Sequence, residues 1–229
     1  MELKVLSSGS QGNCYLIETE MECLILDAGI PIRDIKKGLN FNISKICGVI
    51  VSHWHLDHMK SVKDFRNMGI PVFAPYEDGE IKRIKKQFGN FTVTPFELPH
   101  NGVLNAGFVI ECEEQKILYM TDFEYCKYTF KKQKINHILI ECNYQDELIN
   151  SGLANYEHKV LGHCSLETCR KFIETNTTSS LINVILLHMG QETSNPIECV
   201  ETISKVAGYG VNVDCATPGM ILELNKDLF

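Results

Sequence analysis

The sequence predicts an α/β fold in which one domain, residues 1–229, contains two sheets and outer helices. Short runs rich in β-branched and aromatic residues recur in the first half of the chain, and strand-like and helix-like runs alternate after Gly102. A hydrophobic content of 44% in 229 residues is enough for a sizeable core. The sequence has no solenoid repeat and no low-complexity linker, so two smaller domains are the less favoured alternative.

The expected strands are short apolar runs that are bounded by turn residues. In chain order they are Lys4–Leu6, Cys14–Glu18, Cys23–Leu26, Gly48–Ser52, Val72–Ala74, Phe91–Leu98, Gly107–Cys112, Lys116–Met120, His137–Ile140, Val184–Leu187 and Met220–Leu224. Strands therefore dominate the sequence up to about its middle.

Two stretches have helical periodicity instead. Residues 195–208 place Pro196 at a favoured first helical position and end at Gly208. Residues 165–176 place four apolar side chains on one helical face, namely Leu166, Cys169, Phe172 and Ile173. Both stretches are expected to cover a sheet.

The charge distribution bears on nucleic-acid binding, and the hydrophobic runs bear on the cellular location. The formal net charge of −7 disfavours an indiscriminate polyanion binder. Two local basic runs are either nucleic-acid contacts or solvated helix faces, and they contain Lys82, Arg83, Lys85 and Lys86, and Lys127, Lys131, Lys132 and Lys134. The sequence contains no apolar run of membrane-spanning length and does not begin like a secretory signal, so we expect a cytoplasmic protein without a membrane partner.

Ten cysteines are spread from Cys14 to Cys215 with no CxxC pair, which indicates free thiols rather than a disulfide framework. The stretch LGHCSLETC, residues 161–169, could hold a zinc site or a thiol nucleophile. Better ligands elsewhere in the chain make packing the expected role of Cys164 and Cys169.

Three histidines and an aspartate follow a hydrophobic run in VIVSHWHLDHM, residues 49–59. Burying so many polar groups without partners would be costly, and a metal ion supplies the partner. His53 and His55, at alternate positions, can point the same way, while Asp57 and His58 turn to another side, so one loop can serve two ions. A solvated, histidine-rich turn is the alternative.

Further potential ligands follow other expected strands. His100 lies in LPHNG, Asp122 in TDFE and His188 in HMG. A packed scaffold can hold side chains from several strand ends around one point. Each residue alone would be interpreted as structural, but together with HxHxDH they predict a metal site.

The order LILDAG, SHWHLDH, LPH, TDFE and LLHMG resembles the metallo-β-lactamase superfamily over nearly the whole chain. The segments SSGSQGNCYLIE, ILIECNY, GHCS and LLHMGQETSNP are similar, more narrowly, to its WalJ/YycJ-type branch of DNA-directed hydrolases. The resemblance implies a four-layer αββα sandwich with the active site at one edge.

The resemblance also implies two sets of metal ligands: His53, His55 and His100 for one divalent ion, and Asp57, His58 and His188 for the other, with Asp122 bridging them. Asp27 would orient a ligand through a hydrogen bond. Two cations would lower the pKa of a bridging water, and Asp57 would orient the resulting hydroxide. Nitrogen-rich ligation favours Zn²⁺, with Mn²⁺ and Fe²⁺ as alternatives.

The superfamily cleaves β-lactams, thioesters and phosphodiesters, so the fold does not settle the substrate. An alkoxide leaving group needs a proton, for which histidine is the expected donor. Glu141 in ECNY and His163 in GHCS match the pair of tRNase Z-like phosphodiesterases in which the carboxylate holds the imidazole protonated. His163 is therefore expected to be the general acid, unless it only caps a helix beside a surface glutamate. Tyr144 stands where the WalJ-type branch usually has histidine.

The leading hypothesis is a dinuclear metal-dependent phosphodiesterase, a nuclease acting on DNA rather than RNA. A small-molecule hydrolase, such as a cyclic nucleotide phosphodiesterase or a thioesterase, is the alternative, and a non-catalytic metal-binding scaffold is a third. His137 and His158 match no motif and are expected to be structural. The sequence leaves the oligomeric state open.

Overall fold

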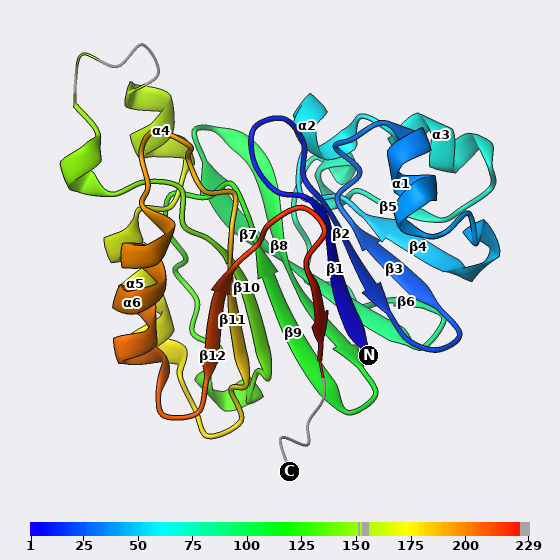
Figure 1. Ribbon diagram of the computed structural model, residues 1–229. Coiled ribbons are helices and arrows are strands. Elements are labelled where there is room, and N and C mark those ends of the chain that lie inside the picture. The colour runs from blue at the N-terminus through cyan, green and yellow to red at the C-terminus, as the bar shows by residue number, and fades with distance from the viewer. Residues whose placement is uncertain (151, 153–155, 225–229) are drawn as a thin grey trace.

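The computed structural model describes residues 1–150, 152 and 156–224. Within these residues the strands form two mixed sheets (Figure 1). The first sheet has the order β13-β1-β2-β3-β4-β5, with β1 (Glu2–Ser7), β2 (Cys14–Glu18), β3 (Cys23–Leu26), β4 (Ile46–Ile50), β5 (Val72–Phe73) and β13 (Ile221–Glu223). The second sheet has the order β12-β11-β10-β9-β8-β7-β6, with β6 (Lys86–Phe88), β7 (Phe91–His100), β8 (Val103–Cys112), β9 (Gln115–Met120), β10 (His137–Glu141), β11 (Asn183–Leu187) and β12 (Asn212–Cys215).

Helices cover the outer faces of both sheets (Figure 1). The α-helices are α1 (Ile32–Gly38), α2 (Leu56–Met59), α3 (Val62–Asn67), α4 (Tyr156–Gly162), α5 (Leu166–Asn176) and α6 (Pro196–Ala207). Short 3₁₀ turns are η1 (Ile43–Lys45), η2 (Pro75–Asp78), η3 (Lys131–Gln133) and η4 (Asp146–Leu148). Helices α1 and α3 lie on the first sheet and α5 and α6 on the second, so the predicted α/β fold with a four-layer αββα order is confirmed.

The inner layer of the sandwich is a core between the two sheets. Tyr15 and Leu26 from the first sheet pack against Phe108, Tyr119 and Leu139 from the second, and all five are fully buried. Successive residues of a strand point to opposite faces, so Ile138 and Ile140, the neighbours of Leu139, face outward. This alternation explains why β10 is apolar on both sides.

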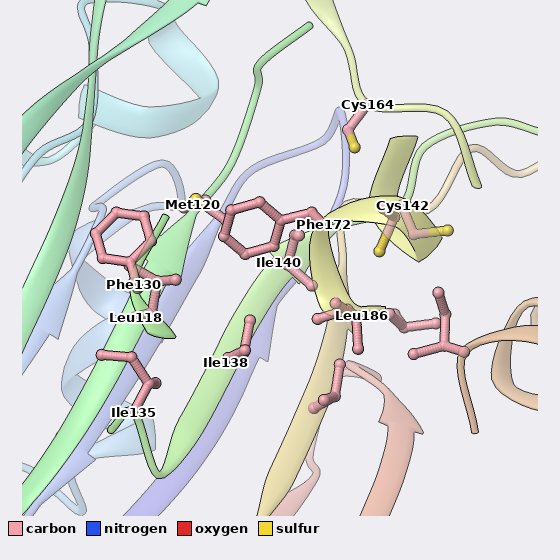
Figure 2. Packing of buried hydrophobic residues seen from close by; sticks show 14 of the residues in the cluster. Leu118, Met120, Phe130, Ile135, Ile138, Ile140, Cys142, Cys164, Phe172 and Leu186 are labelled. Atoms are coloured by element: carbon pink, nitrogen blue, oxygen red, sulfur yellow. The ribbon is translucent and has the colours of Figure 1, made fainter. Parts of the chain in front are cut away.

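The outward faces pack against the helices. Ile138, Ile140 and Leu186 lie on the helix-facing side of the second sheet. They belong to one buried cluster with Phe172 of α5 (Figure 2). Helix α5 begins where the Ser165 side chain accepts a hydrogen bond from the Thr168 backbone N–H, a common N-cap arrangement.

The parallel pairing of strands determines where the candidate site forms. Strands β3 and β4 are parallel, as are β9, β10 and β11, so their carboxyl ends meet at one edge of the sandwich. Helix α2 and the loops after these strands lie at this edge (Figure 1). Ligand sites of α/β sheets form outside the carboxyl ends of strands.

The expected strands and both expected helices are present, with ends shifted by a few residues. Strands β6 and β12 and helices α1 to α4 were not predicted. The basic runs are not helix faces: residues 81–85 form a loop, Lys86 begins β6, and Lys131–Gln133 is a 3₁₀ turn. Among the described residues, no helix is long and apolar enough to cross a membrane.

Candidate metal centre

The predicted site residues lie together at the carboxyl edge of the strands. His100 ends β7, and Glu141 ends β10. The others follow strands within a few residues: Asp27 after β3, His53, His55, Asp57 and His58 after β4, Asp122 after β9, and His188 after β11. His163 follows α4. The chain thus brings residues up to 161 positions apart in sequence, from Asp27 to His188, to one place.

The first group of potential metal donors is His53, His55 and His100, whose ligand atoms lie within 4.8 Å of one another. His53 Nε2 is 2.9 Å, and His100 Nε2 3.3 Å, from His55 Nδ1. His100 Nδ1 lies 2.6 Å from the Gly162 carbonyl oxygen, to which it donates, so Nε2 faces the group. Three imidazole nitrogens at this spacing suit one cation.

A second group joins His53 and His58 to the buried Asp122 carboxylate. Asp122 Oδ2 is 3.3 Å from His58 Nε2 and 3.9 Å from His53 Nε2, so it faces ligands of both predicted ions. Asp57 is outside the three groups, but its Oδ2 is 3.5 Å from His58 Nε2. This arrangement fits a bridging carboxylate between two cations, with Asp57 on the His58 side.

The third group combines Asp122 and His188 with Glu141 and His163, and all four are buried. Asp122 Oδ1 is 2.5 Å from His188 Nδ1. Glu141 Oε1 is 2.7 Å from His163 Nδ1 and 3.3 Å from His188 Nδ1. The Glu141 and His163 pair is therefore adjacent to the metal donors, as the resemblance implied, and Glu141 is not a surface charge.

The buried Asp27 carboxylate accepts hydrogen bonds from several residues of the site. Its Oδ1 accepts from the Ser52 backbone N–H at 2.7 Å, and its Oδ2 accepts from the Tyr119 hydroxyl at 2.5 Å and from His58 Nδ1 at 2.8 Å. Because Nδ1 of His58 is engaged with Asp27, Nε2 is directed toward Asp122. Asp27 thus contacts the histidine that the family resemblance assigns as a ligand, and its ligand-orienting role stays a prediction.

The backbone of the site is strained at three strand ends. Asp27, Asp122 and His188 have φ of 55°, 51° and 47°, in the left-handed region that non-glycine residues rarely adopt. Such conformations persist where surrounding structure over-determines them, and they cluster at functional sites. Here each one turns a side chain inward at the point where its strand ends.

The electrostatics divide the donors into two kinds. Burial lowers the pKa of His53, His55 and His100, so these imidazoles are neutral and have lone pairs for a cation. Burial also opposes charge on His188, but Asp122 and Glu141 outweigh it and raise the pKa of His188 to about 10.

His58 behaves like His188, because Asp122 and Asp27 overcome its burial and raise its pKa well above the usual value. The two imidazoles in turn hold the pKa of the buried Asp122 carboxyl well below its ordinary value. A cation bound between these groups would take the place of protons, which is the usual linkage at histidine and carboxylate ligands. The donor set therefore fits two divalent cations in ligand type, burial and charge.

Several positioning residues were missed by the sequence reading. Asn13 Nδ2 lies 3.1 Å from His58 Nε2. Asn105 Nδ2 donates to the backbone carbonyls of Thr121 at 3.0 Å and Asp122 at 2.6 Å, which fixes the strained turn of Asp122. In the sequence, Asn13 stands out only as part of SSGSQGNCYLIE, a segment of family resemblance, and nothing around Asn105 marks its contact 17 residues away.

Gly29 of LILDAG allows the close approach of α2. A Cβ at Gly29 would lie 1.6 Å from the carbonyl oxygen of Asp57. The same Asp57 oxygen accepts a hydrogen bond from the Asn13 backbone N–H at 2.7 Å. Only glycine therefore lets the loop after β3 support the backbone of the metal-binding loop.

The cysteines of LGHCSLETC pack in the core, as expected. Cys164 and Cys169 are fully buried in the cluster beside Phe172, and Figure 2 shows Cys164 and Cys142 among these apolar side chains. Burial raises the pKa of the Cys164 thiol well above its usual value, so it is a poor nucleophile. No cysteine joins the metal-donor groups found among the described residues.

The remaining predicted residues have different surroundings. His137 is buried away from the centre, between Gln115 and Asn183, which agrees with a structural role. His158 lies at the site, with its ring 5.3 Å from that of His163, a position that the expectation of a structural role did not foresee. Tyr144 is buried, and its backbone forms a bridge with Ser165.

Comparisons with known proteins agree with this geometry. The family model for the metallo-β-lactamase superfamily matches residues 8–78. The exodeoxyribonuclease YycJ of Bacillus anthracis is 23% identical over 92% of this chain and 92% of its own, and the exodeoxyribonuclease WalJ of Streptococcus pneumoniae is 24% identical over 92% and 90%.

Among solved structures, the metallo-β-lactamase fold protein YhfI from Bacillus subtilis has a TM-score of 0.75 at 16% identity, over 97% of this chain and 99% of its own. The match at this identity concerns the fold alone. The chain therefore has the metallo-β-lactamase fold, and the family model and the full-length relatives are similar to it in sequence.

Proposed function

We propose that this protein is a dinuclear metal-dependent phosphodiesterase, a nuclease that acts on DNA. The observation that carries the proposal is the Glu141 and His163 pair, joined at 2.7 Å and adjacent to the metal donors. A metal centre alone could serve any hydrolysis, whereas a positioned imidazole supplies the proton that an alkoxide leaving group needs.

The two predicted ions would be held by the ligand sets around Asp122, with Zn²⁺ favoured by the imidazoles and Mn²⁺ or Fe²⁺ as alternatives. When bound, divalent cations lower the pKa of a coordinated water and neutralise charge on the attacked oxygen. The remaining tasks fall to side chains. Asp57 is partly exposed beside His58 and can orient the attacking water, and Asp122 faces ligands of both sets.

Glu141 fixes the orientation of His163. Glu141 Oε2 accepts from the backbone N–H groups of Phe123 at 3.0 Å and Cys164 at 3.1 Å, which leaves Oε1 to accept from His163 Nδ1. Burial opposes ionisation, but His163 and His188 hold the pKa of Glu141 below its usual value, so the carboxylate is charged. His163 can then direct Nε2–H at the leaving oxygen.

DNA as the substrate is supported by the names of the two full-length relatives. It is also supported by the meeting of both basic runs at Tyr128, where the Arg83 guanidinium lies 4.0 Å and Lys127 Nζ 5.3 Å from the ring centroid. Tyr128 is partly buried against the core, and guanidinium groups beside aromatic rings are common parts of single-strand binding surfaces.

One observation favours the small-molecule alternative. Lys82, Lys85 and Lys127 each form an ion pair with a glutamate, at 2.8, 3.4 and 3.2 Å respectively. These pairs reduce the positive field that a DNA backbone would meet, and the net charge is −7. A cyclic nucleotide or a thioester would not need that field.

A substrate panel separates these possibilities. Protein loaded with Zn²⁺ or Mn²⁺ is assayed on single- and double-stranded DNA, RNA, bis(p-nitrophenyl) phosphate, a cyclic nucleotide and a thioester. We expect DNA to be cleaved, Asp57→Ala to abolish turnover, and His163→Ala to slow mainly esters with poor leaving groups. Cleavage of the thioester or cyclic nucleotide alone would replace the proposal by the alternative, and intact phosphodiesters throughout would refute both the nuclease and the phosphodiesterase.

A further inference from the structure

Lys159, on α4, is a half-buried lysine that forms no ion pair with any of the residues that the structure describes. Its Nζ donates to Asn143 Oδ1 at 2.8 Å and to Thr193 Oγ1 at 3.1 Å, and both acceptors are neutral. Within the part of the chain that the structure describes, no carboxylate oxygen lies at ion-pair distance from this ammonium group. An ammonium has three donors, so one N–H remains for another acceptor.

The ammonium group lies beside the metal centre. Lys159 is one helical turn before His163, whose backbone N–H donates to the Lys159 carbonyl at 3.0 Å. His163 contacts Glu141 while Lys159 contacts Asn143, two residues farther along the same segment. Residues four apart on a helix share a face, so both side chains face the segment that follows β10.

The second acceptor segment also leads to the centre. Asn143 Nδ2 donates to the His188 backbone carbonyl at 2.8 Å, so one amide side chain separates the ammonium from a predicted ligand. A Cβ at Gly190, two residues after His188, would lie 3.2 Å from Lys159 Nζ. The lysine therefore lies between the segment that follows β10 and the loop that follows β11.

A purely structural role does not account for a lysine at this position. Neutral acceptors can be joined equally well by a neutral donor, whereas a partly buried cation without a counter-charge is unfavourable. Burial lowers the pKa of Lys159, and only the nearby Glu141 opposes that effect. The Lys159 ammonium group lies next to a site that is proposed to act on an anionic substrate. An unpaired cation at this place is suited to binding that substrate.

We propose that Lys159 is a substrate-binding residue whose ammonium group binds a phosphoryl oxygen of the phosphodiester. The inference rests on the proposed phosphodiesterase function and specifies the substrate chemistry of the same site. Asn143 and Thr193 hold the ammonium in place, and its third N–H is donated to the phosphate. Lysine is a common phosphate ligand because it presents a compact positive charge.

The test uses Lys159→Gln, Lys159→Met and Lys159→Arg in the metal-loaded full chain. Glutamine retains an N–H donor but loses the charge, methionine loses both, and arginine retains the charge. Lys171→Met is the control, because Lys171 is an exposed lysine on α5 that pairs with Glu167 at 3.3 Å and its loss removes the same net charge.

Equilibrium binding of inorganic phosphate by calorimetry and steady-state kinetics on a DNA oligonucleotide are measured at equal metal content. Loss of a hydrogen bond to a charged group lowers a binding constant by a factor of about 10 to 100. Lys159→Gln and Lys159→Met should therefore weaken phosphate binding and raise KM by that factor. Both should lower kcat less than they raise KM, and the slope of log KM against log salt should fall by about one. Lys159→Arg should restore most of the binding, and Lys171→Met should match the wild type.

Unchanged phosphate affinity and unchanged KM in folded Lys159→Gln would overturn the proposal. A structural role would instead lower the melting temperature and kcat of Lys159→Gln and leave phosphate affinity unaltered, which also overturns it. If Lys159→Met does not fold, the glutamine and arginine variants decide the question. A wild type that binds phosphate through Lys159 but hydrolyses no phosphodiester would refute the proposed function alone.

Discussion

Replacing Glu141 with glutamine tests how the carboxylate controls its neighbouring histidine. The Phe123 and Cys164 backbone N–H groups both donate to Oε2, so the carboxamide oxygen must take that position in Glu141→Gln. The amide N–H₂ then faces His163 Nδ1, which becomes an acceptor. The Nε2–H of His163 then no longer has a carboxylate charge behind its ring, so the histidine is a weaker proton donor to the leaving oxygen.

The expected loss follows from the charge-assisted contact, which a neutral contact replaces. A buried hydrogen bond to a charged partner is worth about 1.5–3 kcal/mol, which corresponds to about a 10- to 150-fold lower kcat at about 1.4 kcal/mol per factor of ten. The assay compares thymidine 5′-(p-nitrophenyl phosphate), a substrate with a good leaving group, with a thymidine dinucleotide, whose alkoxide leaves poorly. The full loss is expected only for the dinucleotide.

A double variant checks that Glu141 acts through His163. Glu141→Gln combined with His163→Ala should be no slower than His163→Ala alone, because residues that act as a unit are not additive. Metal content must match that of the wild type, since Glu141 Oε1 is also 3.3 Å from His188 Nδ1. Losses that multiply, or that are equal for both leaving groups, would refute the proton-donor role.

Three further outcomes are expected. Gly29→Ala should lower the free energy of unfolding in urea by about 1–3 kcal/mol and weaken metal binding, because the added methyl overlaps the Asp57 backbone. An unaltered unfolding midpoint and metal affinity would contradict the close approach of Gly29 to Asp57. Burial lowers the pKa of His137 to about 4, below the unfolded value of about 6.5, so its contribution to stability is complete above pH 6.5 and is lost as the pH falls toward 4, by at most about 3 kcal/mol. His137→Gln should therefore lose less stability than the wild type between pH 7 and pH 5, and equal losses would show that His137 does not titrate in this way. Trp54, the single tryptophan, has its ring 4.8 Å from that of His55, so Zn²⁺ titration should change its fluorescence until the site is filled; unchanged emission in the metal-loaded protein would place the ion elsewhere.

The candidate metal donors can be found in the sequence because several of them are tied to a local signal. His53, Asp122 and His188 all follow a short apolar strand, and parallel pairing of β9, β10 and β11 brings such strand ends together. The two helices with a clear apolar stripe, α5 and α6, are also predicted for a local reason. The assignment of ligands to two ions came from the family resemblance, and it stays a prediction.

The parts that were missed depend on contacts between distant residues. The Tyr119 hydroxyl supports Asp27 across 92 positions, and Asn143 reaches the His188 carbonyl across 45. Helices α1, α3 and α4 are short, so the sequence contains too few turns for a periodic pattern to be recognised. Strand β12 has only one buried residue, Cys215, and lacks the apolar run that marks an inner strand.

The central claim is tested most directly by measuring metal content and phosphodiester turnover on the same preparation. We predict that chelated protein is inactive, that about two equivalents of Zn²⁺ or Mn²⁺ rebind per chain, and that cleavage of single-stranded DNA and bis(p-nitrophenyl) phosphate returns with them. Protein that holds two equivalents of either metal and leaves both of these substrates, double-stranded DNA and RNA intact would contradict the account.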